Sequence, residues 1–485
     1  MRGLFQPRTT GPGSAAPPAS PEVVIRQARA RQRRRRRRTA AAVAMVMVAS
    51  AGAAGAWLAI GRPGGAGPAP PRPATPVLTV DAAAFAGHGE LAFVSRGTLW
   101  VLDGTTKTLR RVPTPPGATP SAPVFSPDGR WLAFLGMTTS RAGTASPRLW
   151  LASGDGRGAH KIRGLPASGL AGWNPARDVL AVTARAAVWL VWPSGRTRAL
   201  VRAAGIGPAA WSPGGGALAV ATATASASTL ASYPLTGGHP TVWARLHARS
   251  GMNYLIDPAG WWPHQGIGFW ALTSSPSLNA DQDPFYVIPA PGTRPRLLGN
   301  TLPGNALNQV AAAAGRLALV GETPGAGLGR VVWQARRIKI CGPAAGACTM
   351  LAAPPSTVTL DPAWSPGGTQ LTFVRAPSRA SPAFPQHALT AWYNAHQLWV
   401  YTPATRSLRK LDASGAAVPA WSADGHSLLY IARDGVWLLP RLTGRPVRIA
   451  TPLFTPGNWP AYYGQVDWNP QFAWWSGQPR PPHAR

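Results

Sequence analysis

The chain has 485 residues, more than one ordinary domain of about 100–200 residues needs, so it holds either several domains or one large repeated domain. Hydrophobic residues make up 45% of it, and 48 Lys and Arg stand against 16 Asp and Glu, a formal net charge of +32. The 54 Gly and 53 Pro are fewer than a wholly disordered chain would have, but they imply many turns and exclude a fold built mainly of long helices.

The N-terminal region carries a topology signal. Residues 1–38 hold 11 Arg and one acid, Glu22, and residues 39–61 (TAAAVAMVMVASAGAAGAWLAIG) follow without a charge. A helix of 23 residues is long enough to cross the hydrocarbon core of a membrane. Because the Arg run comes before this segment, the positive-inside rule predicts a disordered cytoplasmic tail over 1–38, one transmembrane helix over 39–61, and the remaining chain outside. No nucleic-acid partner is expected from such a tail.

A cleaved signal peptide is the alternative interpretation, since Ala54-Gly55-Ala56 resembles a cleavage site. Both interpretations export the same C-terminal region, and the N-terminal sequence of the mature protein distinguishes them. Residues 62–84 are rich in Pro, Gly and Ala and are expected to form a linker, and residues 478–485 a disordered tail.

One short pattern recurs through residues 85–477. It consists of an aromatic residue, Ser or Asn, Pro or Ala, one or two turn residues and an apolar run. Pro fixes φ and Gly supplies a positive φ, so the pattern predicts a tight turn between two strands. The clear copies are FSPDGRWLAF (125–134), WNPARDVLAV (173–182), WSPGGGALAV (211–220), WSPGGTQLTF (364–373) and WSADGHSLLY (421–430). Weaker copies are WWPHQGIGFW (261–270), AAAAGRLALV (311–320) and VDWNPQFAWW (466–475).

A second pattern, an aromatic residue inside an apolar pentad, alternates with the first. The central aromatic residues are Trp100, Trp150, Trp189, Tyr233, Tyr286, Trp333, Trp399 and Trp437. A turn and a basic stretch usually follow each pentad, as in GRTRALV (195–201). Each unit therefore predicts a four-stranded antiparallel meander, with the pentad as its third strand and the basic stretch as its outermost strand.

Such sheets cannot bury both faces alone, but copies packed around an axis can, with aromatic residues filling the space between neighbours. The sequence thus predicts an all-β fold, a β-propeller of four-stranded antiparallel blades over residues 85–477. Eight blades of about 51 residues fit the length, and seven would need about 58 each. The first unit lacks its innermost strand, which the segment 464–475 is expected to supply, closing the ring.

The two patterns resemble the repeat of TolB-type or WD40-like propellers, whose signature is similar to WSPDG followed by an apolar strand and an aromatic pentad. The resemblance covers about residues 85–477 and is weakest between about 250 and 350. It implies architecture and says little about activity, because function lies in sites built on a fold.

Few residues predict chemistry. No G-x-S-x-G, H-E-x-x-H, Walker A or C-x-x-C motif occurs, so no catalytic residue, metal site or cofactor is expected. Asp257, Asp361 and Asp467 come just before the aromatic residue of their repeats, and there they are expected near one mouth of the central channel. Convergent acids can bind a cation or a basic ligand, although Asp-Pro turns that cap loops explain them more simply. The insert 274–285, with Asp281 and Asp283, is interpreted as a solvated loop.

Cys341 and Cys348 flank a turn-like stretch, CGPAAGAC, and an oxidising location outside the cell would let them form a disulfide; two unpaired buried thiols are the alternative.

Beyond residue 38 the chain has a net charge of about +22, which favours an anionic partner. We therefore expect a membrane-tethered binding or scaffold module of the bacterial cell envelope, with a protein, an anionic polymer or a ligand as partner. A secreted propeller hydrolase or lyase that uses channel carboxylates is the alternative function.

Overall fold

In a computed structural model of the chain, the described residues run from 77 to 477, with gaps at 115–116, 140–144, 166, 185, 248–253, 274–281, 303–308, 323–333, 343–346, 380–385 and 454–470. They belong to one compact unit, Pro76–Arg485, which is distinct from Met1–Thr75. The predicted tail 1–38, helix 39–61 and C-terminal tail 478–485 lie outside the described residues. No helix within the described ranges is long and apolar enough to cross a membrane.

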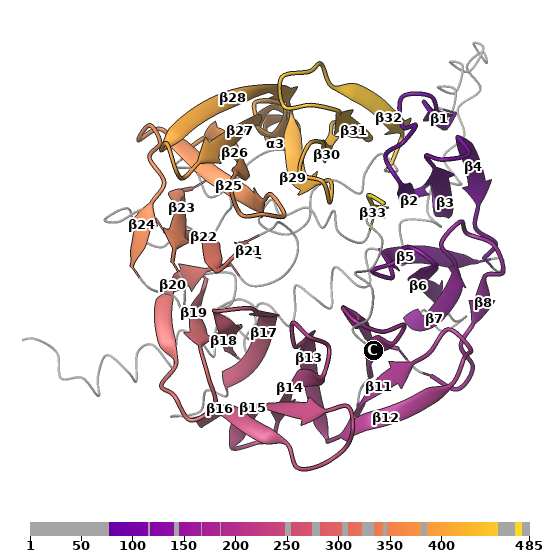
Figure 1. The fold of residues 1–485 in the computed structure, drawn as a ribbon, viewed down its shortest axis with the longest axis vertical. Coiled ribbons are helices and arrows are strands. Elements are labelled where there is room, and N and C mark those ends of the chain that lie inside the picture. The colour runs from indigo at the N-terminus through magenta and orange to yellow at the C-terminus, as the bar shows by residue number, and fades with distance from the viewer. Residues whose placement is uncertain are drawn as a thin grey trace, which may run out of the picture. The chain divides into compact units, whose positions relative to one another are not determined.

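Eight antiparallel sheets form the blades of a propeller, which confirms the prediction of eight blades over seven (Figure 1). In each blade the strands are given from the channel outwards. Blade 1 consists of β33 (Phe472–Trp475), β2 (Glu90–Ser95), β3 (Thr98–Asp103) and β4 (Thr108–Arg111). Blade 2 consists of β5 (Ala118–Phe125), β6 (Trp131–Thr139), β7 (Ala145–Ser153) and β8 (His160–Lys161). Blade 3 consists of β9 (Gly169–Trp173), β10 (Leu180–Ala184), β11 (Ala187–Val191) and β12 (Thr197–Arg202). Blade 4 consists of β13 (Gly205–Trp211), β14 (Ala217–Ala223), β15 (Ala227–Pro234) and β16 (Thr241–His247).

The second half of the ring repeats this arrangement and adds one helix. Blade 5 consists of β17 (Tyr254–Trp262), β18 (Gly266–Thr273), β19 (Asp283–Ile288) and β20 (Arg296–Thr301). Blade 6 consists of β21 (Val310–Ala313), β22 (Arg316–Glu322), β23 (Arg336–Cys341) and β24 (Cys348–Met350). Blade 7 consists of β25 (Thr357–Trp364), β26 (Leu371–Pro377), β27 (Gln397–Thr402) and β28 (Ser407–Ser414), with α3 (Gln386–Asn394) inserted between β26 and β27. Blade 8 consists of β29 (Ala416–Trp421), β30 (Leu428–Ala432), β31 (Gly435–Leu439), β32 (Val447–Thr451) and β1 (Thr79–Val80).

The Ser-Pro-Asp-Gly pattern forms the predicted turn between the first two strands of a blade. In blade 2 the Ser126 hydroxyl donates to Asp128 over 2.6 Å and accepts from the backbone N–H of Trp131 over 3.0 Å. Gly129 has a φ of 72°, a conformation that favours glycine because it has no Cβ. The local sequence therefore fixes the angle at which the second strand leaves the channel wall.

The Trp residue that opens three of the five clear repeats anchors one blade to the blade before it. Its indole N–H donates to a carbonyl on the innermost strand of the preceding blade. The pairs are Trp173 to Val124 over 3.1 Å, Trp211 to Gly172 over 2.8 Å and Trp421 to Ala363 over 3.0 Å. The predicted role of the recurring Trp residues between neighbouring blades is thus confirmed at these three positions.

The innermost strand of several blades contains a β-bulge. At each bulge, two residues of the innermost strand lie opposite one residue of the second strand. In four blades the bulge is an X-Pro dipeptide, a place where the missing N–H of proline breaks no ladder bond. The four dipeptides are Ala122-Pro123, Gly207-Pro208, Asp361-Pro362 and Val418-Pro419. Bulges next to the channel turn selected side chains away from the regular alternation of the strand.

Both ends of the described chain take part in ring closure. β33 is the innermost strand of blade 1 and pairs with β2, with Leu91 opposite Trp474. Strand β1 pairs with β32 at the outer edge of blade 8. The predicted closure by the C-terminal segment is confirmed, and the closing strand, Phe472–Trp475, lies at the end of the predicted segment 464–475. β1 also shows that the propeller begins within the segment 62–84 that we assigned to the linker.

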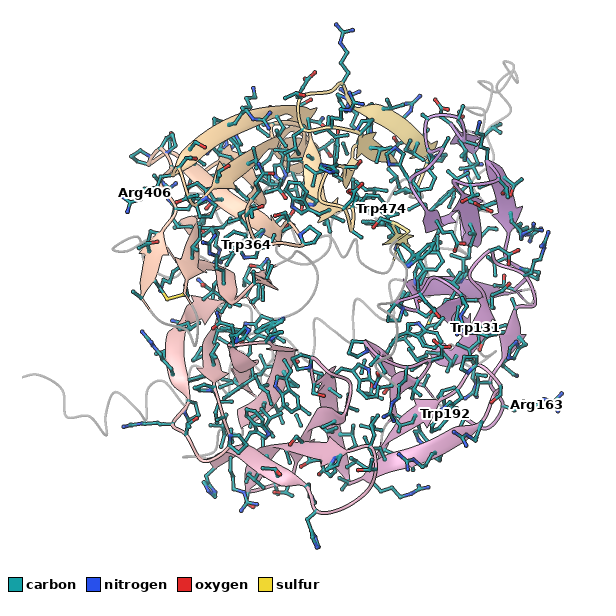
Figure 2. All side chains as sticks on the ribbon, viewed as in Figure 1. Trp131, Arg163, Trp192, Trp364, Arg406 and Trp474 are labelled. Atoms are coloured by element: carbon teal, nitrogen blue, oxygen red, sulfur yellow. A yellow bond between two sulfur atoms is a disulfide. The ribbon has the colours of Figure 1, made fainter. Side chains whose placement is uncertain are left out.

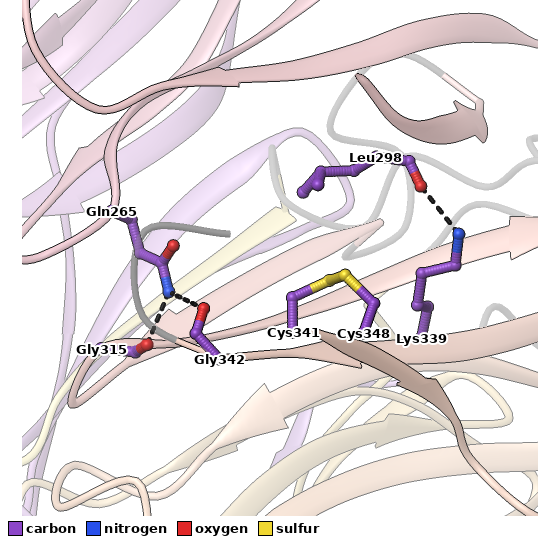
Figure 3. Close-up of a disulfide and its surroundings, with 7 residues drawn as sticks. All are labelled: Gln265, Leu298, Gly315, Lys339, Cys341, Gly342 and Cys348. Carbon is purple, nitrogen blue, oxygen red and sulfur yellow. Dashed lines mark hydrogen bonds between the residues drawn. A yellow bond between two sulfur atoms is a disulfide. The ribbon is translucent and has the colours of Figure 1, made fainter. Parts of the chain in front are cut away.

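Blade 6 departs from the repeat. We expected the pentad 331–335, centred on Trp333, to form its third strand, but that strand is β23, Arg336–Cys341. Lys339 pairs with Leu319 at the position where a central aromatic residue stands in other blades. Its ammonium donates to the carbonyl of Leu298 in blade 5 over 2.7 Å, so a polar contact replaces aromatic packing between these blades (Figure 3).

The two cysteines form a disulfide across the hairpin of β23 and β24 (Figure 3). Their Cα atoms lie 4.1 Å apart, and the residues are directly opposite in the strand register. Beside them the buried Gln265 amide of blade 5 donates to the carbonyls of Gly315 and Gly342, over 2.6 and 2.9 Å. The weakest stretch of the sequence repeat is therefore held by polar bonds and a covalent link.

Candidate functional site

A cavity of about 520 Å³ lies against the innermost strands of three consecutive blades. Its wall is formed by β9 with Thr183, by β13 at Gly207 and Pro208, and by β17 with Trp270 of β18. Of the described residues in this wall, Asp257 is the only ionisable one. It is directly opposite Trp270 in the strand register, so the two side chains share one face of blade 5.

The environment of Asp257 disfavours its charged form. Burial raises the pKa of Asp257 to about 6, and the neighbouring carboxylate of Asp283 raises it further. Burial likewise raises the pKa of Asp283 to about 6, although a hydrogen bond from the backbone N–H of Thr273 opposes the rise. Deprotonation of either of these two carboxyl groups of blade 5 is therefore less favourable than it is in water.

Replacing Asp257 with Asn is expected to flatten the dependence of stability on pH. A carboxyl whose pKa is raised on folding favours the folded state at low pH, and this contribution is lost as the pH rises from about 4 to above 6. The rise of the pKa from 3.8 to about 6 corresponds to an upper limit of about 3 kcal/mol, at roughly 1.4 kcal/mol per pKa unit. At pH 7 we expect the Asn variant to be more stable than the wild type by about 1–2 kcal/mol, less than this limit because the carboxyl group keeps some contact with water.

Urea unfolding at pH 5 and pH 7 measures this effect. Glu90, whose pKa burial raises to about 7 beside Asp103 and Asp155, titrates in the same range, so only the difference between variant and wild type isolates Asp257. An unchanged difference in unfolding free energy at the two pH values would contradict the prediction.

Asp361 does not face this cavity. It lies in the bulge of β25, is fully buried, and accepts a hydrogen bond from the backbone N–H of Val418 in blade 8 over 3.0 Å. Asp257, by contrast, precedes the bulge of β17 and pairs regularly with Trp270. The extra Gly260 in DPAGW, compared with DPAW, shifts the register by one residue, so similar sequences place their acids in different surroundings.

The predicted convergence of acids at one channel mouth is therefore not observed for Asp257 and Asp361, and Asp467 lies outside the described residues. The interpretation of Asp283 as part of a solvated loop is wrong, because this side chain is 1% exposed and begins β19. The alternating pattern DPFYVI gives the signal, since it places Asp283 on the same face as the buried Phe285. Asp281 lies outside the described residues.

The inserted segment that contains α3 carries a second group of buried polar side chains. His396 donates its Nδ1–H to the Ala416 carbonyl over 3.1 Å, and burial lowers its pKa to about 4, so it is neutral at pH 7. Tyr393 is also buried, and the negative charge of Asp361 adds to the rise of its pKa. These groups hold the insert to blades 7 and 8 and present no ionisable atom to solvent.

Basic side chains gather on the outermost strands, as the sequence predicts (Figure 2). We call the Lys and Arg residues of the fourth strands the basic rim. They are Arg110, Arg111, Lys161, Arg198, Arg202, Arg245, Arg296, Arg409, Lys410 and Arg448. All except the half-buried Arg110 are exposed, and the one acid on these strands is Asp412. The adjoining Arg163 and Arg406 extend away from the ring at its outer edge.

The basic rim has no carboxylate partners among the described residues. The ion pairs among the described residues join Arg130 to Asp128 and Asp178, and Arg157 to Asp155. None of these pairs includes a rim residue. Four rim residues are held in place by other contacts. Arg198 and Arg409 donate to the carbonyls of Leu235 and Leu442 over 2.8 and 2.9 Å, Arg245 donates to the Thr229 hydroxyl over 3.3 Å, and Arg202 lies over the ring of Trp189 at 5.1 Å. Apart from Asp412 and from Asp155, whose charge acts on Arg110, the rim is thus a band of like charge within the described structure.

The described residues contain no group of three His, Cys, Asp or Glu side chains placed to hold a metal ion. No known family model matches the chain, and no curated protein matches its sequence. Among solved structures, the chain is similar to one described as a eukaryotic initiation factor, with 14% identity, a TM-score of 0.48, and coverage of 82% of this chain and 90% of that one.

Two further structures show the same kind of likeness. An oligogalacturonate lyase in complex with manganese is 13% identical, with a TM-score of 0.41 and coverage of 80% of this chain and 87% of that one. A putative TolB from Agrobacterium tumefaciens is 14% identical, with a TM-score of 0.32 and coverage of 80% and 97%. Similarity at this level concerns the propeller fold and carries no ligand or activity to this chain.

Proposed function

We propose that this chain is a membrane-tethered binding module of the bacterial cell envelope, in which an extracytoplasmic propeller binds an anionic partner through its basic rim. The observation that carries the proposal is the rim itself, ten Lys and Arg residues against Asp412 on the outermost strands. A one-signed band of exposed charge attracts a polymer of opposite charge from a distance and binds it in a salt-dependent way.

The sequence supports the tether and the location. The Arg run before residues 39–61 and the Pro-rich stretch after them favour an anchor with the propeller outside. The disulfide between Cys341 and Cys348 fits an oxidising compartment. The alternative function, a hydrolase or lyase with a ring of channel carboxylates, loses support because Asp361 is buried in contact with blade 8.

The rim proposal is tested with the full-length chain and a fluorescent long-chain polyphosphate as the anionic probe. Reversing two exposed charges on neighbouring outer strands, Lys410→Glu and Arg448→Glu, is expected to weaken binding about 20-fold or more. Each basic residue close to an anionic surface contributes about 1 kcal/mol, roughly fivefold in affinity. The wild type should also lose affinity steeply as salt is raised.

The matched control is the pair Arg96→Glu and Arg433→Glu. These two residues are exposed as well, but they lie in the turns between the second and third strands of blades 1 and 8, away from the fourth strands. Both double variants change the net charge by the same amount. Equal losses of affinity in the two would mean that net charge alone acts, and would overturn the rim as the binding surface, as would wild-type binding that does not change with salt.

A further inference from the structure

The cavity beside the channel has a composition that differs from the basic rim. Among the described residues that line it, Asp257 is the only charged group, and none is Lys, Arg or His. The wall is otherwise made of backbone, small apolar side chains, two hydroxyl groups and the indole of Trp270. In a chain with 48 basic and 16 acidic residues, a cavity with one acid and no base is an exception to the general charge.

The hydrogen-bonding groups of the wall are mainly acceptors. The Ser168 hydroxyl donates to the Thr183 carbonyl over 2.9 Å, and the Thr183 hydroxyl is directed at the Gly169 carbonyl over 3.3 Å. Their protons are thereby used within the wall, and the oxygen lone pairs remain. The Asp257 carboxylate adds further acceptors, so the wall suits a ligand that donates.

Trp270 forms an apolar part of the wall. Its side chain is 4% exposed and packs against Phe285, with the two ring centroids 5.1 Å apart. Its indole N–H has no acceptor among the residues that the structure describes, but it is buried and closed to a ligand in the cavity. The Asp257 carboxylate is therefore the polar group of blade 5 that a ligand in this cavity can reach.

We propose that this cavity binds a small organic ammonium ion, whose N–H groups donate to the Asp257 carboxylate. A volume of about 520 Å³ is within the range of ordinary small-molecule sites. A bare divalent cation does not fit the wall, because it needs several oxygen ligands at short range and one carboxylate supplies too few.

The electrostatics of blade 5 support the sign of the ligand charge. Asp257 and Asp283 both have raised pKa values of about 6, and the described lining of the cavity includes no basic group to offset their charge. An ammonium placed beside Asp257 would supply the missing counter-charge and lower its pKa again. The site is independent of the basic rim, which lies on the outermost strands.

Isothermal titration calorimetry of the full-length chain tests the site, with glucosamine and glucose as probes. The two sugars differ only in an ammonium in place of one hydroxyl group. We expect glucosamine to bind at least about tenfold more tightly than glucose, because a charge-assisted hydrogen bond is stronger than a neutral one. Asp257→Asn should abolish the preference.

The control variant is Asp412→Asn, which removes a carboxylate from an exposed position on β28. It should leave glucosamine binding unchanged. Thermal unfolding establishes that each variant is folded, and the comparison of the two sugars on the wild type tests the site even where Asp257→Asn does not fold. Equal binding of the two sugars, no binding of glucosamine, or a preference that survives in Asp257→Asn would overturn the proposal.

Discussion

Ending the chain at Pro470 is expected to remove most of the stability of the propeller. This truncation deletes β33, and with it the innermost strand of blade 1. The backbone groups of β2 that pair with β33 would be exposed at the channel, and Leu91 and Phe93, both fully buried, would lose cover. Burying large apolar side chains contributes about 1.5–3 kcal/mol each, and folded domains are stable by only about 5–15 kcal/mol.

The C-terminal segment also joins three blades. The indole of Trp474 donates to the His88 carbonyl over 2.7 Å, and that of Trp475 donates to the Pro127 carbonyl of blade 2 over 3.1 Å. The Ser476 hydroxyl accepts from the backbone N–H of Ala423 in blade 8 over 2.7 Å. Losing these contacts removes part of the connection between the last blade and the first, while the pairing of β1 with β32 and the bond from the Ser95 hydroxyl to the Pro452 carbonyl remain. The truncation is therefore expected to weaken the closure of the ring as well as to remove a strand.

Urea unfolding and limited proteolysis measure the effect. The matched control ends at Gly477 and therefore keeps β33 and Ser476 while removing the residues after them. We expect the control to unfold like the full chain, and the shorter chain to unfold at much lower urea or to be digested under native conditions. Closure by β33 would be of no importance to the ring if the two truncated chains unfolded at the same urea concentration.

The repeat could be predicted from the sequence because one local pattern makes each blade. Ser126, Asp128 and Gly129 form their turn from neighbouring groups alone, so five clear and three weaker copies could predict eight blades, with seven as the alternative. Aromatic residues mark the contacts between blades for the same reason, since each repeats at one place in the strand register. Such features depend on short stretches of chain and are visible without the fold.

Three features could not be predicted in this way. The pairing of β1 with β32 joins the two ends of the chain, and nothing in the residues Thr79 and Val80 marks it. The third strand of blade 6 lacks an aromatic centre because Lys339 bonds to blade 5 instead. The cavity beside the channel is built from three blades, so its wall combines residues such as Thr183 and Asp257 that are far apart in sequence.

The two Asp-Pro dipeptides show how a single residue decides the environment of an acid. DPAW at 361–364 and DPAGW at 257–261 looked equivalent as candidate binding sites. The bulge of β25 contains Asp361 itself, whereas the bulge of β17 comes after Pro258. One acid therefore accepts a buried backbone N–H, and the other lines a cavity.

The same comparison gives opposite predictions for stability. Asp361→Ala is expected to destabilise the protein by about 3 kcal/mol, because the buried N–H of Val418 loses its acceptor. Asp361 also has a φ of 50°, a left-handed conformation that Asp and Asn tolerate better than Ala. Asp361→Asn keeps an acceptor oxygen and suits this backbone, so its loss should be about 1 kcal/mol or less.

Urea unfolding at pH 7 compares these variants with Asp257→Asn, which we expect to be stabilising because it removes a charge that burial disfavours. If Asp361→Ala were no more destabilising than Asp361→Asn, the bond to Val418 would have no structural role, and Asp361 would again be a candidate for binding. The predicted opposite signs follow from position alone, since both residues are aspartates followed by proline on an innermost strand. A channel acid in a propeller must therefore be placed relative to its bulge before it is assigned a function.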